Sequence, residues 1–422
     1  MCGIVGYIGT KTARGLLIEG LKRLEYRGYD SAGIAVINGK LNIARTIGRV
    51  AMLEERLEQL AAAGPKDANG NGPFDGSLGI CHTRWATHGG VTEHNAHPHR
   101  DDRHGIAVVH NGIMENYSAL KKYLQEKGHK FSSETDTEVI AMLIGELYEG
   151  DLESAVQAAL REVDGAYAIA VICEKEPDAL VVARKGSPLF VGIGADEYII
   201  ASDAAAIVAH TTHAFALDDY NVVKITRKSG FRTSTIHNVP VTPKIEQLEL
   251  DLEQIELGGY QHFMLKEIFE QPQSIRNCLS GRIDAKQGKV TLGGLANFGK
   301  ELTRAKKVIL TAQGTALHAA MIGRYLMEDL AKVQAQTEYA SEFRYRNPII
   351  EDGTVVVAVS QSGETADTLA ALHEAKERGA LALGVVNVVG SSIARQTDAG
   401  IYLRVGPEIG VASTKAFLGQ VA

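Results

Sequence analysis

The chain has 422 residues, of which 45% are hydrophobic and 23% are charged, and its net charge at pH 7 is -7. This composition is typical of an α/β protein with two or three domains, and the acidic balance argues against a nucleic-acid surface, which normally needs a basic face. No apolar run is long enough to span a membrane, and the four cysteines lack metal-ligand spacing, so we expect a cytoplasmic protein.

The first residues, Met1-Cys2-Gly3-Ile4-Val5-Gly6, place a cysteine where removal of Met1 would give it a free α-amine. An α-amino group titrates at about pH 8, so part of it can accept the thiol proton at neutral pH without a histidine. Cys2 could therefore combine nucleophile and base. The alternative is an inert, buried cysteine that opens a strand.

From Cys2 to residue 226, short β-branched runs alternate with amphipathic stretches. Strands are predicted at residues 34–37, 105–109, 166–172 and 197–200, and helices at 16–24, 51–60 and 115–126. This pattern predicts an α+β layer structure. Residues 64–76, rich in Gly, Asn and Pro, predict a mobile surface loop to which we assign no function.

The pattern changes in the second half of the chain. Glu-rich sequence with Pro240 and Pro243 predicts a domain connection. Beyond it, strands are predicted at 307–312, 354–359 and 380–388, with intervening helices at 316–330 and 366–378. Such alternation predicts a doubly wound parallel sheet, which binds ligands beyond the carboxyl ends of its strands. A helix predicted near Ser413 has hardly begun when the chain stops, and we interpret this as truncation.

Residues of the first half together fit the hydrolysis of a primary amide. The oxyanion formed by thiolate attack needs hydrogen-bond donors, and Asn111 and Gly112 offer an amide group and a backbone N–H. Arg84 suits the carboxylate of an α-amino acid, and Asp136 suits its ammonium group. Taken singly, Arg84 also fits a surface ion pair and Asp136 a helix cap.

Several motifs of the first half occur together and in order. They are Cys2–Gly6, Tyr26–Gly33, Arg84–Gly89, His97-Pro98, His110–Gly112 and Ser133–Thr137. The set resembles the class II glutamine amidotransferases, which have the N-terminal-nucleophile hydrolase fold, an αββα sandwich. Within that class, Glu25–Ser31 and the second half of the chain resemble the glutamine:fructose-6-phosphate aminotransferases.

The resemblance implies a role for each matching residue. Cys2 would be the nucleophile and base, with Asn111 and Gly112 as oxyanion donors. Trp85 would be the ammonia gate. Four residues would surround bound L-glutamine: Arg84, Thr87, His88 and Asp136. Four others would support the glutaminase site: Arg27, Gly28, His97 and His110.

Seven histidines lie between His82 and His110, which raises the question of zinc. The segment has no helical His-x-x-x-His pair and no cysteine partner set, so we expect neither a metal ion nor another cofactor.

The segment Ser360–Thr365 lies between an apolar strand and a helix start. Its hydroxyls and the N–H groups of a helix N-terminus suit an anion, although an elaborate N-cap is the alternative. Gln313–Thr315 and Val411–Thr414 should emerge at the same sheet edge. A sugar phosphate fits that edge better than a dinucleotide, since no GxGxxG or Walker lysine pattern follows a strand.

These motifs resemble the sugar isomerase domain, which binds phosphosugars. The implied phosphate and sugar contacts are Thr315, Ser360, Gln361, Ser362, Thr365 and Ser413. The family usually has Cys-Gly-Thr-Ser where this chain has Gln313-Gly314-Thr315-Ala316, so one hydroxyl contact is missing at Ala316. The family's second sugar isomerase domain, which carries a Schiff-base lysine, is expected to be absent from this chain.

We expect a glutaminase domain at residues 2–229, a linker with connecting helices at 230–297 and a first sugar isomerase domain at 298–422. The expected reaction of the full-length protein is glutamine hydrolysis with ammonia transfer to fructose 6-phosphate, giving glucosamine 6-phosphate and glutamate. This chain alone would support only the glutaminase step. A homodimer through the sugar isomerase domains is expected. Two alternatives are an amidotransferase with another phosphosugar acceptor or deglycase-like activity, and a sugar-phosphate-sensing regulator without turnover.

Overall fold

The computed structural model describes residues 2–64, 66, 70–86, 89–248 and 257–422. The chain divides into two compact units, Met1–Leu252 and Glu253–Ala422. Within the described residues, no helix is long and apolar enough to cross a membrane.

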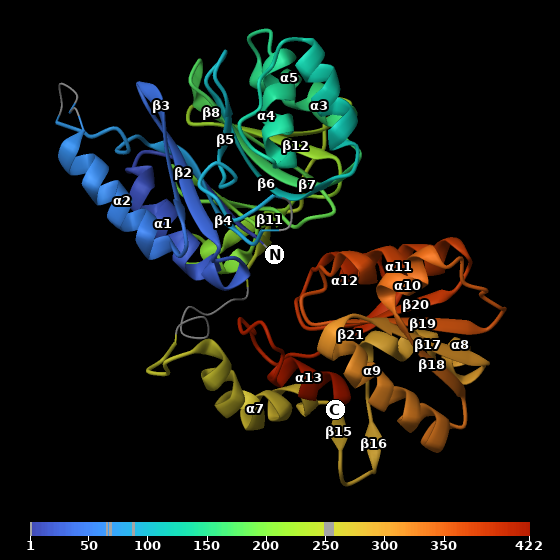
Figure 1. Ribbon diagram of the computed structural model, residues 1–422. Helices are drawn as coiled ribbons and strands as arrows, with labels where there is room; N and C mark the ends of the chain where they lie inside the picture. The colour runs from blue at the N-terminus through green and yellow to red at the C-terminus, as the bar shows by residue number, and fades with distance from the viewer. Residues whose placement is uncertain (1, 65, 67–69, 87–88, 249–256) are drawn as a thin grey trace. The chain divides into compact units, whose positions relative to one another are not determined.

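The described part of the first unit contains two antiparallel sheets that stack face to face (Figure 1). The larger sheet has the strand order β14-β11-β9-β10-β1-β4-β2-β3, and the smaller has the order β13-β12-β8-β7-β6-β5. The strands are β1 (Gly3–Ile8), β2 (Ser31–Asn38), β3 (Lys40–Ile47), β4 (Leu78–Arg84), β5 (His99–Asp101), β6 (Ile106–Met114), β7 (Gly165–Cys173), β8 (Glu176–Lys185), β9 (Phe190–Ile193), β10 (Tyr198–Ala201), β11 (His213–Ala216), β12 (Asn221–Thr226), β13 (Gly230–Thr235) and β14 (Glu246–Gln247).

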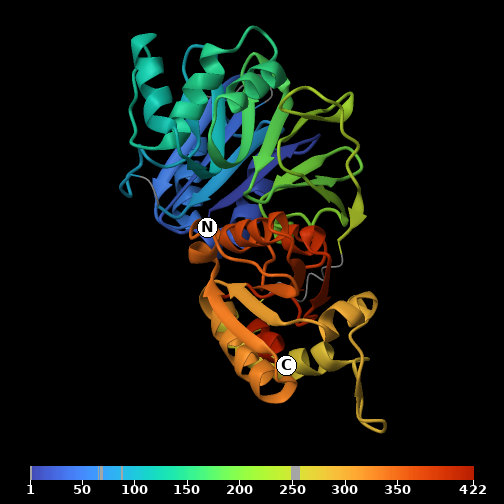
Figure 2. The same ribbon diagram turned by 90° about the vertical axis from the view of Figure 1, so that its right-hand side faces the viewer.

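Helices cover the outer face of each sheet (Figures 1 and 2). Helices α1 (Ala13–Leu24) and α2 (Val50–Ala63) pack on the larger sheet. Helices α4 (Asp136–Glu146) and α5 (Leu152–Arg161) pack on the smaller sheet, and α3 (Tyr117–Glu126) packs on α4. The predicted layer structure is therefore confirmed as an αββα sandwich.

Strand alternation explains the apolar layers of this sandwich. In β1, Ile4 and Ile8 face the smaller sheet, whereas Val5 and Tyr7 face α1. Successive side chains of a strand point to opposite faces, so one central strand contributes to two cores. The predicted loop at 64–76 lies partly outside the described residues, at positions 65 and 67–69, but Phe74 within it is buried against the helix layer.

The second unit contains the predicted doubly wound parallel sheet, with the strand order β18-β17-β19-β20-β21. Its elements are α7 (Phe263–Leu279), β15 (Ile283–Asp284), β16 (Lys289–Val290), α8 (Gly299–Thr303), β17 (Lys307–Ala312), α9 (Gly314–Leu326), β18 (Gln334–Tyr339), α10 (Ala340–Tyr345), β19 (Thr354–Ser360), α11 (Ala366–Glu377), β20 (Leu381–Val386), α12 (Ser392–Gln396), β21 (Ala399–Tyr402) and α13 (Lys415–Val421). The strand order reverses between the neighbours β17 and β19, which creates a topological switch point, the usual ligand position in such sheets.

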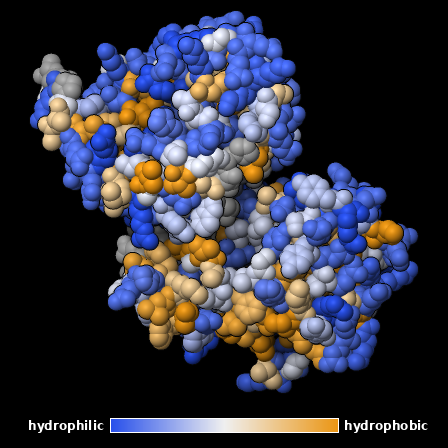
Figure 3. Space-filling view, viewed as in Figure 1, coloured by the Kyte–Doolittle hydropathy of each residue, from blue (hydrophilic) through white to orange (hydrophobic). Residues whose placement is uncertain are grey.

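Helix α7 belongs to the second unit because it packs against α13 and buries Cys278 beside Leu403 and Val405. Residues 230–247 contain β13 and β14, which pair at the edges of the two sheets of the first unit. The domain limits expected at 229/230 and 297/298 stay a prediction. Apolar side chains also reach the surface of the second unit (Figure 3), and the exposed ones on and after α9 include Tyr325, Leu326 and Leu330.

Candidate functional sites

Cys2 opens onto a pocket of the first unit. The pocket is lined by Cys2, Arg84, Trp85, His97, His110, Gly112, Thr135, Asp136 and Thr137. Gly3 pairs with Thr83 of β4, which places Cys2 beside the end of that strand. The pocket therefore combines the start of β1, the end of β4, the strand β6 and the first turn of α4.

The Cys2 thiol makes contacts with the backbone of Trp85. The Trp85 N–H donates to Sγ at 3.3 Å, and the thiol donates to the Trp85 carbonyl at 3.6 Å. Burial raises the pKa of the Cys2 thiol above its ordinary value, while the Trp85 N–H and the positive charge of Arg84 lower it in part. The thiol is therefore mainly protonated at neutral pH, and attack on a substrate requires a base.

Asn111 and Gly112 of β6 lie beside Cys2. The Asn111 Nδ2 donates to the Cys2 carbonyl oxygen at 3.0 Å, and because a primary amide has two N–H groups, one remains for a substrate oxygen. Gly112 has φ +142°, and a Cβ there would lie 2.0 Å from the Ala166 carbonyl oxygen. Only glycine fits this position, and its backbone lines the pocket.

Arg84 and Asp136 bring opposite charges to the same pocket. The Arg84 side chain is buried and donates to the Gly90 carbonyl at 3.2 Å, so the surface ion-pair interpretation is wrong. Asp136 follows the N-cap residue of α4, and its carboxylate accepts the Met114 N–H at 2.9 Å, so it is not an ordinary cap. A cation and an anion near one thiol suit the α-carboxylate and α-ammonium groups of an amino acid.

Two further predicted residues support the neighbouring backbone. Arg27 is buried and donates to the Ser202 carbonyl at 3.1 Å, and the Ser202 hydroxyl accepts the N–H of Ile4 at 3.0 Å. A Cβ at Gly28 would lie 2.7 Å from the Arg84 carbonyl carbon, so glycine permits this approach. These contacts hold the start of β1 and the end of β4 in place.

Of the other predicted residues, Thr87 and His88 lie outside the described part of the chain. Trp85 is partly exposed and makes an edge-on contact with Tyr29, with ring centroids 5.4 Å apart. His110 Nδ1 lies 3.0 Å from the Thr137 hydroxyl, and the ring centroids of His97 and His82 are 4.3 Å apart, with the two rings tilted by 32°.

No individual role was predicted from the sequence for His82, His99, Thr135 and Thr137. Thr135 and Thr137 bond to His99 and His110, which fixes the pocket wall. Strand periodicity was the available signal for His82, since it places His82 and Arg84 on one face of β4. Among the residues that the structure describes, no group of three His, Cys, Asp or Glu side chains could hold a metal ion.

In the second unit, Ser360–Thr365 connects β19 to α11. The hydroxyls of Ser360 and Thr365 are 3.0 Å apart, and the Gly363 N–H donates to Ser360 Oγ at 3.0 Å. The Ser362 hydroxyl accepts the Glu364 N–H at 3.1 Å. Gly363 has φ +65°, and a Cβ there would lie 2.0 Å from Ser391 Oγ. Gln361 is in the same turn.

The N-terminal ends of α9 and α11 follow the adjacent parallel strands β17 and β19. Their N-cap residues, Gln313 and Thr365, make no side-chain capping bond, and the hydroxyls of Ser360 and Ser362 accept N–H groups of the loop that precedes α11. Uncapped N–H groups and the helix dipole favour an anion at this edge. Thr315 lies exposed in the first turn of α9, whereas Ala316 is buried among apolar residues.

Ser413 precedes α13, and this helix packs against α9. Its hydroxyl donates to Glu408 at 2.7 Å, and Glu408 also accepts the N–H groups of Thr414 and Ala416 at 2.8 and 3.1 Å. Glu408 therefore holds the predicted sugar contact Ser413 in a fixed turn.

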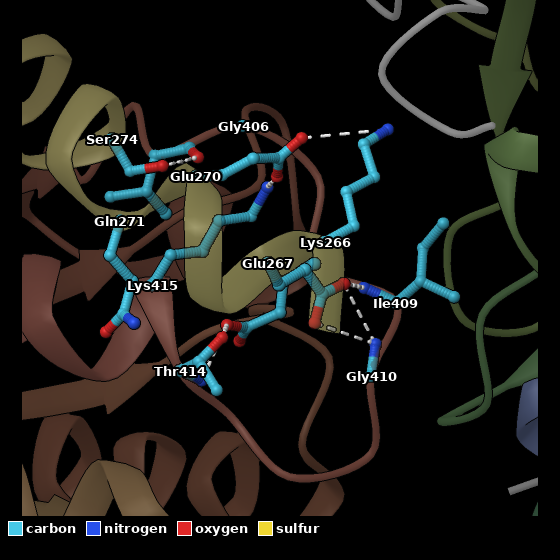
Figure 4. A network of polar contacts seen from close by, with 12 residues as sticks. Lys266, Glu267, Glu270, Gln271, Ser274, Gly406, Ile409, Gly410, Thr414 and Lys415 are labelled. Atoms are coloured by element: carbon cyan, nitrogen blue, oxygen red, sulfur yellow. Dashed lines mark hydrogen bonds and ion pairs between the residues drawn. The ribbon is translucent and has the colours of Figure 1, made fainter. Parts of the chain in front are cut away.

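A charged network connects this turn to α7 (Figure 4). Glu267 accepts the N–H groups of Ile409 and Gly410 at 2.5 and 3.0 Å, and burial raises the pKa of its carboxyl group. The buried Lys415 ammonium lies 2.5 Å from Glu270. This network was not predicted from the sequence, because Lys415 and its partner Glu270 are 145 residues apart.

Two family models match this chain. Residues 36–256 match the model of a glutamine amidotransferase domain, and residues 301–422 match that of the SIS domain. A solved structure described as the allosteric regulatory enzyme of purine biosynthesis has a TM-score of 0.50 at 18% identity, and the match covers 100% of this chain and 92% of that one. That likeness concerns the fold alone. The chain is thus a glutamine amidotransferase joined to a SIS domain.

Two curated relatives indicate a more specific family within this class of protein. Both are named glutamine--fructose-6-phosphate aminotransferase [isomerizing]; they come from Chlorobaculum tepidum and Bacteroides thetaiotaomicron and are each 51% identical to this chain. The matches cover 100% of this chain and 68% and 67% of the relatives, so the chain spans about two thirds of their length. The chain belongs to the glutamine–fructose-6-phosphate aminotransferase family.

Proposed function

We propose that the first unit hydrolyses L-glutamine at Cys2 and that the full-length protein transfers the released ammonia to fructose 6-phosphate. The products are glucosamine 6-phosphate and glutamate, and the protein is an enzyme of the transferase class. The observation that carries the proposal is the Cys2 pocket, where the thiol, the Asn111 amide, Arg84 and Asp136 lie together.

The proposed hydrolysis has two steps. The Cys2 thiol loses its proton to its own α-amine after removal of Met1, and Sγ forms a bond to the γ-carbonyl carbon of glutamine. The oxyanion accepts hydrogen bonds from Asn111 and Gly112, and when the C–N bond breaks the amine returns the proton to the departing ammonia. Water then cleaves the γ-glutamyl thioester, which releases glutamate and restores the thiol. Arg84 and Asp136 hold the amino-acid end of the substrate.

The second unit supplies half of the acceptor site in this proposal. The uncapped N-terminal ends of α9 and α11 favour the phosphate group of fructose 6-phosphate, and the hydroxyls of Thr315, Ser360, Ser362 and Thr365 surround those ends. Gln361 and Ser413 are proposed sugar contacts. Trp85 is proposed to gate the passage of ammonia.

Self-association and cellular location are two further proposals. The exposed apolar residues Tyr325, Leu326 and Leu330 in the second unit support a homodimer through this unit, because contiguous apolar surface often marks an interface. Scattered free cysteines support a cytoplasmic location.

The test is glutamate release from glutamine by the purified chain, after mass spectrometry has shown that Met1 is removed. We expect Cys2→Ala to abolish release. Cys278→Ala, which removes a buried thiol of the second unit, is the matched control and should retain the rate. Turnover that persists in Cys2→Ala would refute the proposal. In the full-length protein, fructose 6-phosphate should stimulate glutamate release and yield glucosamine 6-phosphate, and another amino-sugar product would identify a different acceptor.

A further inference from the structure

A polar pair crosses the apolar layer between the two sheets of the first unit. His82 lies on β4 of the larger sheet, and Asn111 lies on β6 of the smaller one. Their Nε2 and Oδ1 atoms are 3.0 Å apart, and both side chains are buried. The surrounding layer is built from apolar residues such as Ile80 and Val109. A polar contact between the sheets, next to such an apolar layer, calls for an explanation.

The contact to Cys2 determines how the Asn111 amide is turned. Its Nδ2 lies 3.0 Å from the Cys2 carbonyl oxygen, where only a hydrogen-bond donor fits. A flipped amide would place two carbonyl oxygens against each other. Asn111 Oδ1 therefore faces His82 and can only accept, so His82 Nε2 must carry the proton.

The other ring nitrogen of His82 supports a specific rather than a packing role. Nδ1 is buried and has no well-aligned hydrogen-bond partner among the described residues, although the backbone of His110 lies beside the ring. A buried polar atom without a well-aligned partner destabilises the fold, whereas two apolar side chains of similar volume would avoid that cost. The ring is held in place by its contact with His97, whose centroid is 4.3 Å away.

We propose that His82 is a positioning residue for glutamine hydrolysis, whose Nε2–H holds the Asn111 amide so that its N–H groups face Cys2 and the oxyanion. This inference rests on the proposed glutaminase activity. His82 is not among the described residues that line the substrate pocket. Burial lowers the pKa of His82 to about 3, so the imidazole stays neutral near neutral pH.

Removal of the His82 donor should weaken the binding of the transition state more than the binding of glutamine. In His82→Leu the donor is gone, and Asn111 can turn away from the oxyanion. We expect the kcat for glutamate release to fall by roughly 30- to 100-fold, at or below the lower end of the roughly 100- to 1000-fold range for loss of one oxyanion donor, because Asn111 is displaced and not removed. The KM for glutamine should change less than about twofold, because Arg84 and Asp136 bind the amino-acid end independently.

Three variants separate positioning from packing. His82→Gln returns a side-chain N–H at similar reach and should restore kcat to within about tenfold of the unaltered chain. The double variant His82→Leu/Asn111→Ala should be no slower than Asn111→Ala, because both changes remove one interaction. His129→Leu is the control: His129 is also buried, but it bonds to Glu146 at the end of α4 opposite Asp136. It should leave kcat unchanged.

An aldehyde analogue of glutamine gives a readout that packing alone would not change. The Cys2 thiol adds across its C=O bond, which forms a C–S bond and places the resulting oxygen in the oxyanion site. His82→Leu should weaken this analogue by the same factor as kcat, while the affinity for L-glutamate should change less than about twofold. Equal weakening of both ligands would overturn the proposal.

Other results would also overturn it. They are an unchanged kcat in folded His82→Leu, a loss that His82→Gln does not restore, and losses that multiply in the double variant. The ¹⁵N resonances of His82 in the unaltered chain give a test without turnover, and an Nδ1–H tautomer would contradict the proposal. Should the unaltered chain release no glutamate, the proposed function fails, while the tautomer still decides whether His82 donates to Asn111.

Discussion

The two units build their candidate sites in different ways. The first unit collects buried side chains from separate strands, such as Arg84 of β4 and Asn111 of β6, around one thiol. The second unit uses a contiguous loop, Ser360–Thr365, with uncapped backbone N–H groups at the start of α11. Buried side-chain sites depend on exact sheet pairing, whereas a loop at a helix N-terminus depends mainly on local sequence. The two sites should therefore respond differently to pH and to substitution.

Acid should produce the largest difference between the units. Burial lowers the pKa of His82 to about 3 and holds the pKa values of His97 and His99 well below 6.5. Below pH 6.5 the unfolded chain binds protons that the folded unit does not, so stability is full above pH 6.5 and falls as the pH drops toward 3. At pH 5.5 each histidine that stays neutral in the folded unit lowers its stability by roughly 1 kcal/mol, and the three together by a few kcal/mol.

The single tryptophan, Trp85, lies in the first unit, so its fluorescence reports that unit alone. We expect its thermal midpoint to fall by about 10 °C between pH 7.5 and 5.5. The histidines of the second unit, His262, His318 and His373, are exposed. Burial raises the pKa of Glu267 in this unit. The contribution of Glu267 to stability is therefore full at low pH and is lost as the pH rises through the raised pKa. The protection factors of the β19 amides against hydrogen exchange should therefore change little, and an equal loss of stability in both units would contradict the comparison.

The difference between a site built from a local loop and a site built from separate strands also determines which features could be predicted from the sequence. The loop Ser360–Thr365 follows an apolar run and precedes a helix, so its position at a sheet edge was predicted from neighbouring residues. The sandwich, the parallel sheet and the polar groups of Arg84, Asn111 and Asp136 were also predicted. The bond between His82 and Asn111 was not, because it depends on how two sheets stack. Nor was the network around Lys415, whose acidic partner Glu270 comes from α7.

Lys415→Met should have a smaller, local effect on the second unit. The Lys415 side chain is 4% exposed and its Glu270 partner 30% exposed, so the pair is only partly shielded from water. We expect the second unit to lose about 2 kcal/mol of stability, which is below the 3–5 kcal/mol for a fully buried pair. The loss is smaller because Glu270 still pairs with the Lys266 ammonium, which lies 3.6 Å away. Amide exchange in α7 and α13 should accelerate by roughly 30-fold, and fructose 6-phosphate should bind more weakly as the Ser413 turn loosens.

The control for that change is Lys376→Met. Lys376 also pairs with a carboxylate, Asp398, but the two side chains are 38% and 32% exposed. Such surface pairs contribute about 0–1 kcal/mol, so exchange should change less than about fivefold. If the two variants have equal effects, the network around Lys415 does not stabilise α7 against α13.

The smallest expected effect is a gain from Ala316→Ser, which restores the hydroxyl that the family usually has. Ala316 lies in the first turn of α9 and is buried beside Leu317. If the proposed phosphate site is correct, a serine hydroxyl there adds one hydrogen bond, worth about 1 kcal/mol or fivefold in the Kd for fructose 6-phosphate. Ala320→Ser is the control, because it buries a hydroxyl one turn farther from the N-terminus of α9.

Calorimetric titration with fructose 6-phosphate and with inorganic phosphate measures both variants. A gain with both ligands would place the new contact on the phosphate group, and a gain with the sugar alone would place it on the sugar. Unchanged affinity in a stable Ala316→Ser chain would mean that side chain 316 packs into the core and that the backbone N–H groups of α9 bind the anion without it.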